Sequence, residues 1–151
     1  MLSTTSEYAL RALVQLARLP QGQPMLGREL SIKAEVPRTY LSKILLTLRT
    51  ARLLEATRGT HGGYRLLRHP ESIYLIEVVE LFEVVHRQPR CVLANERECS
   101  SEHPCTAHAM LHEAREALMH ALIGTTLQQI AYGDTDDAKE RRLEGGNATP
   151  F

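Results

Sequence analysis

Three cysteines and one histidine stand close together in one stretch of this chain. Cys91, Cys99 and Cys105 are the only cysteines among 151 residues, and His108 follows the last of them after two residues. Thiolate sulfur is the usual ligand of iron–sulfur clusters, and three thiolates leave a fourth ligand position open. If residues 105–108 form the first turn of a helix, Cys105 and His108 share a face and can reach one centre. The pattern therefore favours an iron–sulfur cluster with these four residues as ligands.

Other uses of the same side chains stay open. Three cysteines and a histidine are also a standard structural zinc set, although zinc sites usually contain a closer cysteine pair than any found here. Two of the thiols could instead form a regulatory disulfide that leaves the third over. The four side chains could also be present without a bound metal.

The beginning of the chain and its apolar runs bear on where the protein resides. Glu7, Arg11 and Arg18 interrupt the first apolar pattern, so no secretory signal is visible, and no apolar run reaches membrane-spanning length. We therefore expect a cytoplasmic protein without a membrane partner. In that compartment, clustered cysteines serve as ligands or redox groups more often than as structural disulfides.

Charge is distributed unevenly along the chain. The formal net charge is zero, with 18 basic and 18 acidic residues. Residues 28–69 nevertheless contain nine Lys or Arg and three Glu, a net of +6, so the remainder carries −6. A local basic patch is what binding to nucleic-acid phosphates requires, although a solvated basic face without a partner would have the same composition.

Residues 26–50 have the pattern of a helix-turn-helix. We expect a short helix over 26–33, a tight turn over 34–36, and a second helix that begins at Pro37, where the missing amide hydrogen is tolerated. The apolar residues of this second helix fall on one face. They are Leu41, Ile44, Leu45 and Leu48. Its other residues are polar or basic and are suited to base edges or phosphates. The predicted DNA contacts are Arg38, Thr39, Tyr40, Ser42 and Lys43, of which Tyr40 could equally be a packing residue.

A glycine-rich hairpin is expected directly after the helix-turn-helix. Residues 53–57 and 64–67 are short strand candidates, and Arg58-Gly-Thr-His-Gly-Gly63 lies between them. Glycine adopts positive φ without steric cost and lets the backbone approach a sugar–phosphate strand. An ordinary hairpin turn is the alternative, but its position after a helix-turn-helix favours a DNA-contacting wing. The predicted wing contacts are Arg58, Gly59, Thr60 and His61.

Further helices are predicted on both sides of this unit. Thr4-Thr-Ser-Glu7 has the spacing of a capping box for a first helix. A strand-like start followed by a helix is predicted over 73–85. A long helix is predicted from Pro104, where a narrow apolar seam recurs at spacings of three and four. Its members are Ala107, Met110, Leu111, Ala114, Ala117, Leu118, Ala121 and Leu122. We favour pairing of this seam with a second copy of the chain over packing on its own domain, and expect one more short helix over 125–132.

The predicted fold class is mainly α, with a winged helix-turn-helix domain plus a long dimerisation helix. We assign residues 1–72 to the DNA-binding domain. Residues 73–132 would form the connecting helix, the cysteine loop and the dimerisation helix. Residues 133–151 are expected to be a disordered tail, because they are rich in polar residues and glycine.

Three motifs and the cysteine loop occur in an order that is known from one family. They are Ser6-Glu-Tyr-Ala-Leu-Arg11, Tyr40-Leu-Ser-Lys-Ile-Leu-Leu46 and Arg58-Gly-Thr-His-Gly-Gly-Tyr-Arg-Leu66, followed by three cysteines and a long helix. Over roughly residues 1–132 the chain resembles the Rrf-type winged helix-turn-helix transcription regulators, the family of IscR-like and NsrR-like iron–sulfur proteins. The resemblance implies a homodimer held by the long helix, with the recognition helix in a major groove of double-stranded DNA and the wing in a minor groove.

The resemblance also implies a set of cluster ligands. Three of them fall on Cys91, Cys99 and Cys105. IscR-like members use a histidine at the offset of His108, whereas NsrR-like members use an acidic residue near the N-terminus of the partner chain, which matches Glu7. We rank His108 first, because Glu7 already has a role in the expected capping box and because Cys105 and His108 would form a local, preformed site.

Two features differ from the familiar pattern of the family. Seven residues separate the first two cysteines where familiar members have five, and Thr60-His61 replaces a usual Pro-Gly pair.

A two-iron cluster (2Fe-2S) is favoured, and a four-iron cluster (4Fe-4S) stays open.

The sequence thus predicts a homodimeric, DNA-binding transcription regulator whose operator affinity is controlled by an iron–sulfur cluster that senses iron, redox state or nitric oxide. A zinc-based or thiol-based regulator of the same fold is the alternative. A cluster-bearing electron carrier fits less well. No nucleotide-binding glycine loop and no catalytic-triad spacing occurs, so we do not expect an enzyme.

Overall fold

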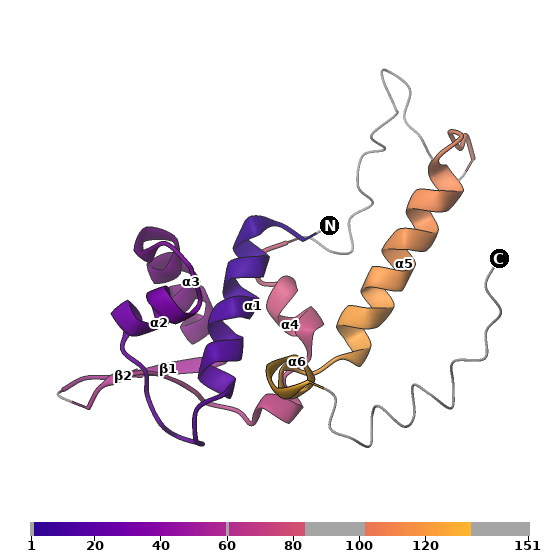
Figure 1. Ribbon diagram of the computed structural model, residues 1–151. Coiled ribbons are helices and arrows are strands. Elements are labelled where there is room, and N and C mark those ends of the chain that lie inside the picture. The colour runs from indigo at the N-terminus through magenta and orange to yellow at the C-terminus, as the bar shows by residue number, and fades with distance from the viewer. Residues whose placement is uncertain (1, 60, 84–101, 134–151) are drawn as a thin grey trace.

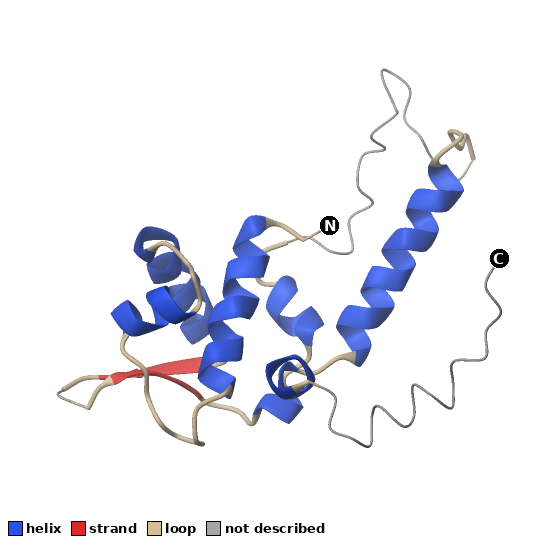
Figure 2. Ribbon diagram, viewed as in Figure 1, coloured by secondary structure: helices blue, strands red, loops and turns tan. Residues whose placement is uncertain are grey.

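The computed structural model describes residues 2–59, 61–83 and 102–133, and in them the chain is mainly helical (Figures 1 and 2). The elements in chain order are α1 (Thr4–Ala17), α2 (Gly27–Lys33), α3 (Arg38–Thr50), β1 (Leu54–Thr57), β2 (Gly63–Leu66), the 3-10 helix η1 (Pro70–Ser72), α4 (Leu75–Val79), α5 (His108–Gly124) and α6 (Leu127–Tyr132). Cys91, Cys99, Thr60 and the predicted tail from residue 134 lie outside the described residues. The predicted fold class is confirmed.

The first helix begins one residue earlier than the expected capping box. Ser3 is the N-cap, with an extended backbone (φ −69°, ψ 154°), and its hydroxyl accepts a hydrogen bond from the Ser6 amide at 3.2 Å. Thr4 is already helical and cannot take this position, so the predicted Thr4–Glu7 capping box is wrong. Among the described residues, the exposed Glu7 side chain has no hydrogen-bond or salt-bridge partner.

The helix-turn-helix forms as predicted, with α3 starting just after Pro37. Glu35 adopts a positive φ of 54° between α2 and α3. This conformation lets the Val36 amide donate to the Ser31 carbonyl at 3.0 Å, while the Ser31 hydroxyl donates to the Val36 carbonyl at 2.6 Å. The predicted apolar face of α3 is buried, and its members Leu41, Ile44, Leu45 and Leu48 are each at most 3% exposed.

The wing is an antiparallel hairpin that gains a third strand-like partner from the loop before α2. The pairing of β1 and β2 runs from Leu54 opposite Leu66 to Thr57 opposite Gly63. Tyr64 of β2 also forms a two-way bridge with Met25, with N···O distances of 2.9 and 2.8 Å. The hairpin is therefore attached to the helical unit along its second strand as well as through the chain.

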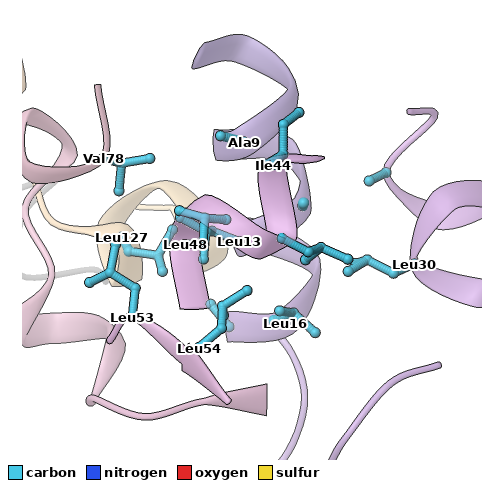
Figure 3. Close-up of a cluster of buried hydrophobic side chains, with 14 of the residues drawn as sticks. Ala9, Leu13, Leu16, Leu30, Ile44, Leu48, Leu53, Leu54, Val78 and Leu127 are labelled. Carbon is cyan, nitrogen blue, oxygen red and sulfur yellow. The ribbon is translucent and has the colours of Figure 1, made fainter. Parts of the chain in front are cut away.

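The hydrophobic core lies between α1, α3, β1 and the C-terminal helix α6 (Figure 3). Leu13, Leu48 and Leu54 are fully buried in it, and Leu127 of α6 reaches the same cluster. The ends of α1 and α6 are also joined by polar contacts. Arg18 Nε donates to the Ala131 carbonyl, and the Tyr132 hydroxyl donates to the Ala17 carbonyl, both at 2.8 Å.

Residues on both sides of position 72 contribute to this core. Ile73 and Val78 are buried in the main cluster. The predicted strand-like start at residue 73 is a short bridge, in which the Leu127 amide donates to the Ile73 carbonyl at 2.8 Å and the Leu75 amide donates to the Thr125 carbonyl at 3.0 Å. The proposed domain boundary at 72 and 73 stays a prediction.

The helix predicted up to residue 85 is shorter than expected. α4 ends at Val79, and the chain continues in tight turns in which the Leu81 amide donates to the Val78 carbonyl and the Phe82 amide to the Val79 carbonyl. These turns direct Leu81 and Phe82 onto the main core, where both are partly buried. The more compact path therefore replaces further α-helical turns because it buries two more apolar side chains.

The long helix α5 stands apart from the core and contacts α4 (Figure 1). Within α5, all of which is described, Leu122 is the one buried side chain, and it packs with Leu118 against Leu75 and Val79. None of the helices in the described ranges combines the length and apolar character that a membrane span needs.

Candidate functional site

The first half of α3 presents the side chains that were predicted to contact DNA. Arg38, Thr39, Tyr40, Ser42 and Lys43 are all exposed, while the opposite face of the helix is buried. The Ser42 hydroxyl donates to the Arg38 carbonyl within the helix at 2.9 Å, so it presents mainly an acceptor to the outside. A helix with a fixed apolar face and an open polar face is the form in which recognition helices enter a major groove.

Tyr40 is both exposed and packed. Its side chain is 56% exposed, and its ring lies edge-on to that of Tyr8, with centroids 6.0 Å apart and an interplanar angle of 67°. The Arg11 guanidinium stands 5.9 Å from the Tyr8 ring centroid. The two interpretations of Tyr40 are therefore compatible, because one edge contacts α1 while the rest of the ring remains available.

The wing tip is open, and its glycines are required by its geometry. Arg58, Gly59 and His61 are exposed, and Thr60 lies outside the described residues. A Cβ on Gly62 would come within 2.3 Å of the Thr57 carbonyl oxygen. The wing points away from α5, toward the same side of the molecule as α2 and α3 (Figure 1).

The basic residues of segment 28–69 fall into two groups. Three of them are neutralised in salt bridges: Lys33 with Glu29 at 2.9 Å, Arg65 with Glu55, and Arg68 with Glu77 at 2.6 Å. The other six are exposed and make no salt bridge with any residue in the described ranges. They are Arg28, Arg38, Lys43, Arg49, Arg52 and Arg58. The available positive charge is thus concentrated on α2, α3 and the wing, where phosphate contacts would be needed.

The structure describes two of the four predicted ligands of the candidate metal centre. Cys91 and Cys99 lie outside the described residues, and Cys105 and His108 lie inside them. Cys105 lies before α5, and His108 is the first residue of α5. The two residues are therefore connected by a non-helical turn, and not by the first turn of the helix as predicted. In this turn the His108 amide donates to the Cys105 carbonyl at 3.0 Å.

The surroundings of this turn are partly polar. Cys105 and His108 are both half-buried, and the His108 ring stacks on that of His112, with centroids 6.4 Å apart. Among described residues, no three His, Cys, Asp or Glu side chains are gathered closely enough to hold a metal ion. A centre that uses Cys105 and His108 therefore needs further donors from outside the described residues, such as Cys91 and Cys99, or from a partner chain.

Glu83 makes a contact with the beginning of α1 that the sequence does not predict. This residue leads directly into the cysteine-containing segment, and its Oε1 accepts a hydrogen bond from the Ser3 amide at 2.7 Å. Burial acts to raise the pKa of Glu83, but hydrogen bonds from Ser6 and Ser3 outweigh it and hold the pKa below its ordinary value. A contact across 80 positions of sequence leaves no local pattern by which it could have been found.

A comparison with known protein families shows to which family the chain belongs. A family model described as "Rrf2: Iron-dependent Transcriptional regulator" matches residues 2–133. The chain belongs to the Rrf2 family. The HTH-type transcriptional regulator NsrR of Geobacillus kaustophilus is 31% identical over 129 residues, which cover 85% of this chain and 88% of that protein.

Solved structures agree with this Rrf2 assignment. CymR (YrzC), described as the global cysteine regulator of B. subtilis, superposes with a TM-score of 0.69 at 25% identity, over 89% of this chain and 98% of that one. T. potens IscR gives a TM-score of 0.63 at 20% identity, over 99% and 93% of the two chains, a likeness that concerns the fold. The protein is a DNA-binding transcription regulator by family, and its named relatives are regulators rather than enzymes.

Proposed function

We propose that this Rrf2-family protein is a homodimer whose affinity for an operator depends on an iron–sulfur cluster held by Cys91, Cys99, Cys105 and His108. The observation that carries the proposal is the turn at the start of α5, which joins a half-buried thiol to a half-buried imidazole. Thiolate and imidazole are donors that iron accepts. The iron-dependent description of the family and the likeness to an NsrR protein give independent support.

The cluster, when bound, would supply a labile redox-active centre. A histidine ligand is protonatable and binds more weakly than thiolate, which suits a sensor better than an electron carrier. The contribution of the chain is to place Cys105 and His108 at the beginning of α5, next to the proposed dimer surface. A change at this turn acts directly on the helix that would join the two subunits.

The DNA-binding part of the proposal assigns α3 to a major groove and the wing to a minor groove. Its support is the exposure of the predicted contact residues that the structure describes, together with the six exposed basic side chains of residues 28–58 that make no salt bridge with a described residue. Basic side chains without an intramolecular partner are available to displace counterions from phosphates. The direct contacts we propose are those predicted from the sequence, with Lys43 and Arg58 as the charges at the recognition helix and the wing.

The homodimer part of the proposal rests on the exposed seam of α5. Met110 is 65% exposed and Leu111 38%, whereas a helix packed on its own domain would cover such residues. Leu118 and Leu122 turn toward α4 and leave the N-terminal part of the seam open. A second α5 would bury this surface and place two recognition helices on two half-sites of one operator.

The test is a spectrum with iron and sulfide analysis on protein purified without oxygen. We expect visible absorbance with matching iron and sulfide, and different operator affinities for cluster-loaded and cluster-free protein. His108→Ala should change the spectrum, whereas His120→Ala, a change on an exposed turn of the same helix, should not. A colourless protein that stays without a cluster after reconstitution, or equal affinity of both forms for every operator tested, would refute the proposal.

A thiol-based regulator of the same fold is the second candidate. The observation in its favour is the likeness to CymR, which is described as a cysteine regulator. In this case oxidation of the cysteines, rather than loss of a cluster, would change operator affinity. Metal-free protein whose affinity changes reversibly with a thiol oxidant and a reductant would favour this candidate, and stoichiometric zinc would favour a zinc-based form.

A further inference from the structure

The contact between Glu83 and the beginning of α1 joins the two parts of the protein that a sensor must connect. Glu83 is the last described residue before segment 84–101, and Cys91 follows it by eight positions. Its carboxylate accepts from the Ser3 amide, at the helix end where the Ser3 hydroxyl accepts from the Ser6 amide. The end of the α4 region and the N-terminus of α1 accordingly lie next to each other (Figure 1).

Glu83 stabilises this end of the helix in two ways. The first amides of an α-helix lack partners inside the helix, and a negative charge is favourable near them. Ser6 is the one buried polar residue among those described, and its hydroxyl helps to lower the pKa of the Glu83 carboxyl. The Ser6 hydroxyl also accepts a hydrogen bond from the Ser3 hydroxyl at 3.2 Å, so Ser3, Ser6 and Glu83 form one polar cluster at this end of the helix.

The helix that Glu83 holds supports the recognition helix. Two residues after Ser6, the Tyr8 ring contacts Tyr40 of α3 edge-on. Further along, Leu13 packs in the same buried cluster as Ile44 (Figure 3). A displacement of the first turn of α1 therefore reaches the exposed half of α3 through an aromatic contact, whereas the buried half of α3 is held by the core.

We propose that Glu83 is a positioning residue, which transmits the state of the cysteine-containing segment to the recognition helix by holding or releasing the N-terminus of α1. This inference rests on the proposed sensing function, since it needs a centre whose state changes. With Glu83 in place, Ser3 is held and Tyr8 supports Tyr40. When Glu83 leaves this position, the first turn of α1 loses its acceptor and Tyr40 loses its support.

The test compares Glu83→Ala with Glu71→Ala in the full-length protein. Both changes remove one carboxylate together with its acceptor oxygens, and Glu71 is exposed on η1 with no hydrogen bond or salt bridge to a described residue. Operator affinity is measured with and without the cluster. We expect Glu83→Ala to reduce the ratio of the two affinities by about fivefold or more, the lower end of typical coupling factors, and Glu71→Ala to leave the ratio unchanged. Thermal unfolding checks that each variant is folded.

Ser6→Ala provides a second variant, which removes the buried hydroxyl of the same polar cluster. It should reduce the same ratio, and the double variant Ser6→Ala/Glu83→Ala should do no more than either change alone, because the residues act through one cluster. A folded Glu83→Ala protein with the wild-type ratio, or effects of the two changes that add in full, would overturn the proposal.

Hydrogen exchange separates failure of this inference from failure of the proposed function. If wild-type protein shows no difference between cluster-loaded and cluster-free forms, sensing itself fails. The positioning role is then judged by amide exchange in residues 4–8 and 39–43. Faster exchange in both segments in Glu83→Ala, and not in Glu71→Ala, supports the mechanical link, whereas unchanged exchange in the second segment refutes it.

Discussion

Gly63 and Gly59 of the wing form a matched pair for testing how the hairpin is attached. Both glycines have a positive φ, 148° at Gly63 and 108° at Gly59, which L-residues rarely adopt. They differ in their surroundings. A Cβ on Gly63 would lie 2.5 Å from the Met25 carbonyl oxygen, whereas nothing lies within 4 Å of a Cβ on Gly59. Alanine at either position therefore strains the backbone, but only alanine at Gly63 also collides with the backbone of Met25.

The free energies follow from these two differences. Forcing an alanine into an unfavourable positive φ costs about 1–2 kcal/mol, and this part applies to both variants. Gly63→Ala must also separate β2 from Met25, which breaks the two hydrogen bonds of the Met25–Tyr64 bridge. Each is worth about 0.5–1.5 kcal/mol, so the variant should lose a further ~1–3 kcal/mol. We expect Gly63→Ala to be destabilised by about 2–5 kcal/mol in total and Gly59→Ala by about 1–2 kcal/mol.

Urea unfolding followed by circular dichroism measures these differences, and amide exchange at Met25 and Tyr64 reports the bridge itself. Gly63→Ala should show faster exchange at both amides and weaker operator binding, because the wing is no longer held against the helical unit. Equal destabilisation of the two variants, with the bridge amides still protected in Gly63→Ala, would show that the clash is relieved without breaking the bridge and would refute the reasoning.

Two further predictions concern charge. Lys43→Ala should weaken binding to specific and non-specific DNA alike and reduce the slope of log affinity against log salt by about 1, the effect of losing one phosphate contact. Lys33→Ala should change the slope less, because Lys33 is paired with Glu29. An equal change of slope in the two variants would contradict the division of the basic residues into those with and those without a salt bridge. Glu77 has a pKa below its ordinary value of 4.5 because Arg68 hydrogen-bonds it, against an opposing effect of burial and with help from the Tyr74 amide. The contribution of Glu77 to stability is present above pH 4.5 and is lost as the pH falls through the lowered pKa. Between about pH 6 and pH 3, the unfolding temperature should therefore fall less steeply in Glu77→Gln than in the wild-type protein. An equal fall in the two proteins would contradict this assignment.

The sequence was informative wherever local spacing determines structure. The apolar face of α3, the Gly-rich hairpin, the end of α5 at Gly124 and the position of α6 follow from periodicity and turn chemistry, and the structure confirms them. The start of α5 differs, because the helix begins at His108 and not at Pro104 as predicted. The return of α6 onto α1 does not follow in this way. It depends on pairs such as Arg18 with Ala131 and Tyr132 with Ala17, which are more than a hundred residues apart and leave no local pattern.

The same distinction explains the errors at helix ends. Ser3 and Thr4 both carry a hydroxyl, and only the backbone conformation at Ser3 decides which of them caps α1. α4 ends at Val79 because Leu81 and Phe82 can reach the core of α1 from a tighter turn, which the apolar pattern of residues 73–85 does not distinguish from a continued helix. Residues 84–101 contain two of the three predicted cysteine ligands, so for those ligands the prediction stands on donor chemistry and on the family.

The corrected cap changes the balance between the two candidates for the fourth cluster ligand. Glu7 was ranked second partly because its carboxylate was assigned to a capping box, and the structure removes that role, leaving the side chain exposed on the first turn of α1. His108 keeps its advantage of lying in one turn with Cys105, but Glu7 now has no competing contact among described residues. As a ligand, Glu7 would come from the partner chain and would connect the centre to the α1 helix of the other subunit. His108 would connect the centre to α5 and the proposed dimer surface. The identity of this ligand therefore decides which of the two elements responds first to loss of the cluster.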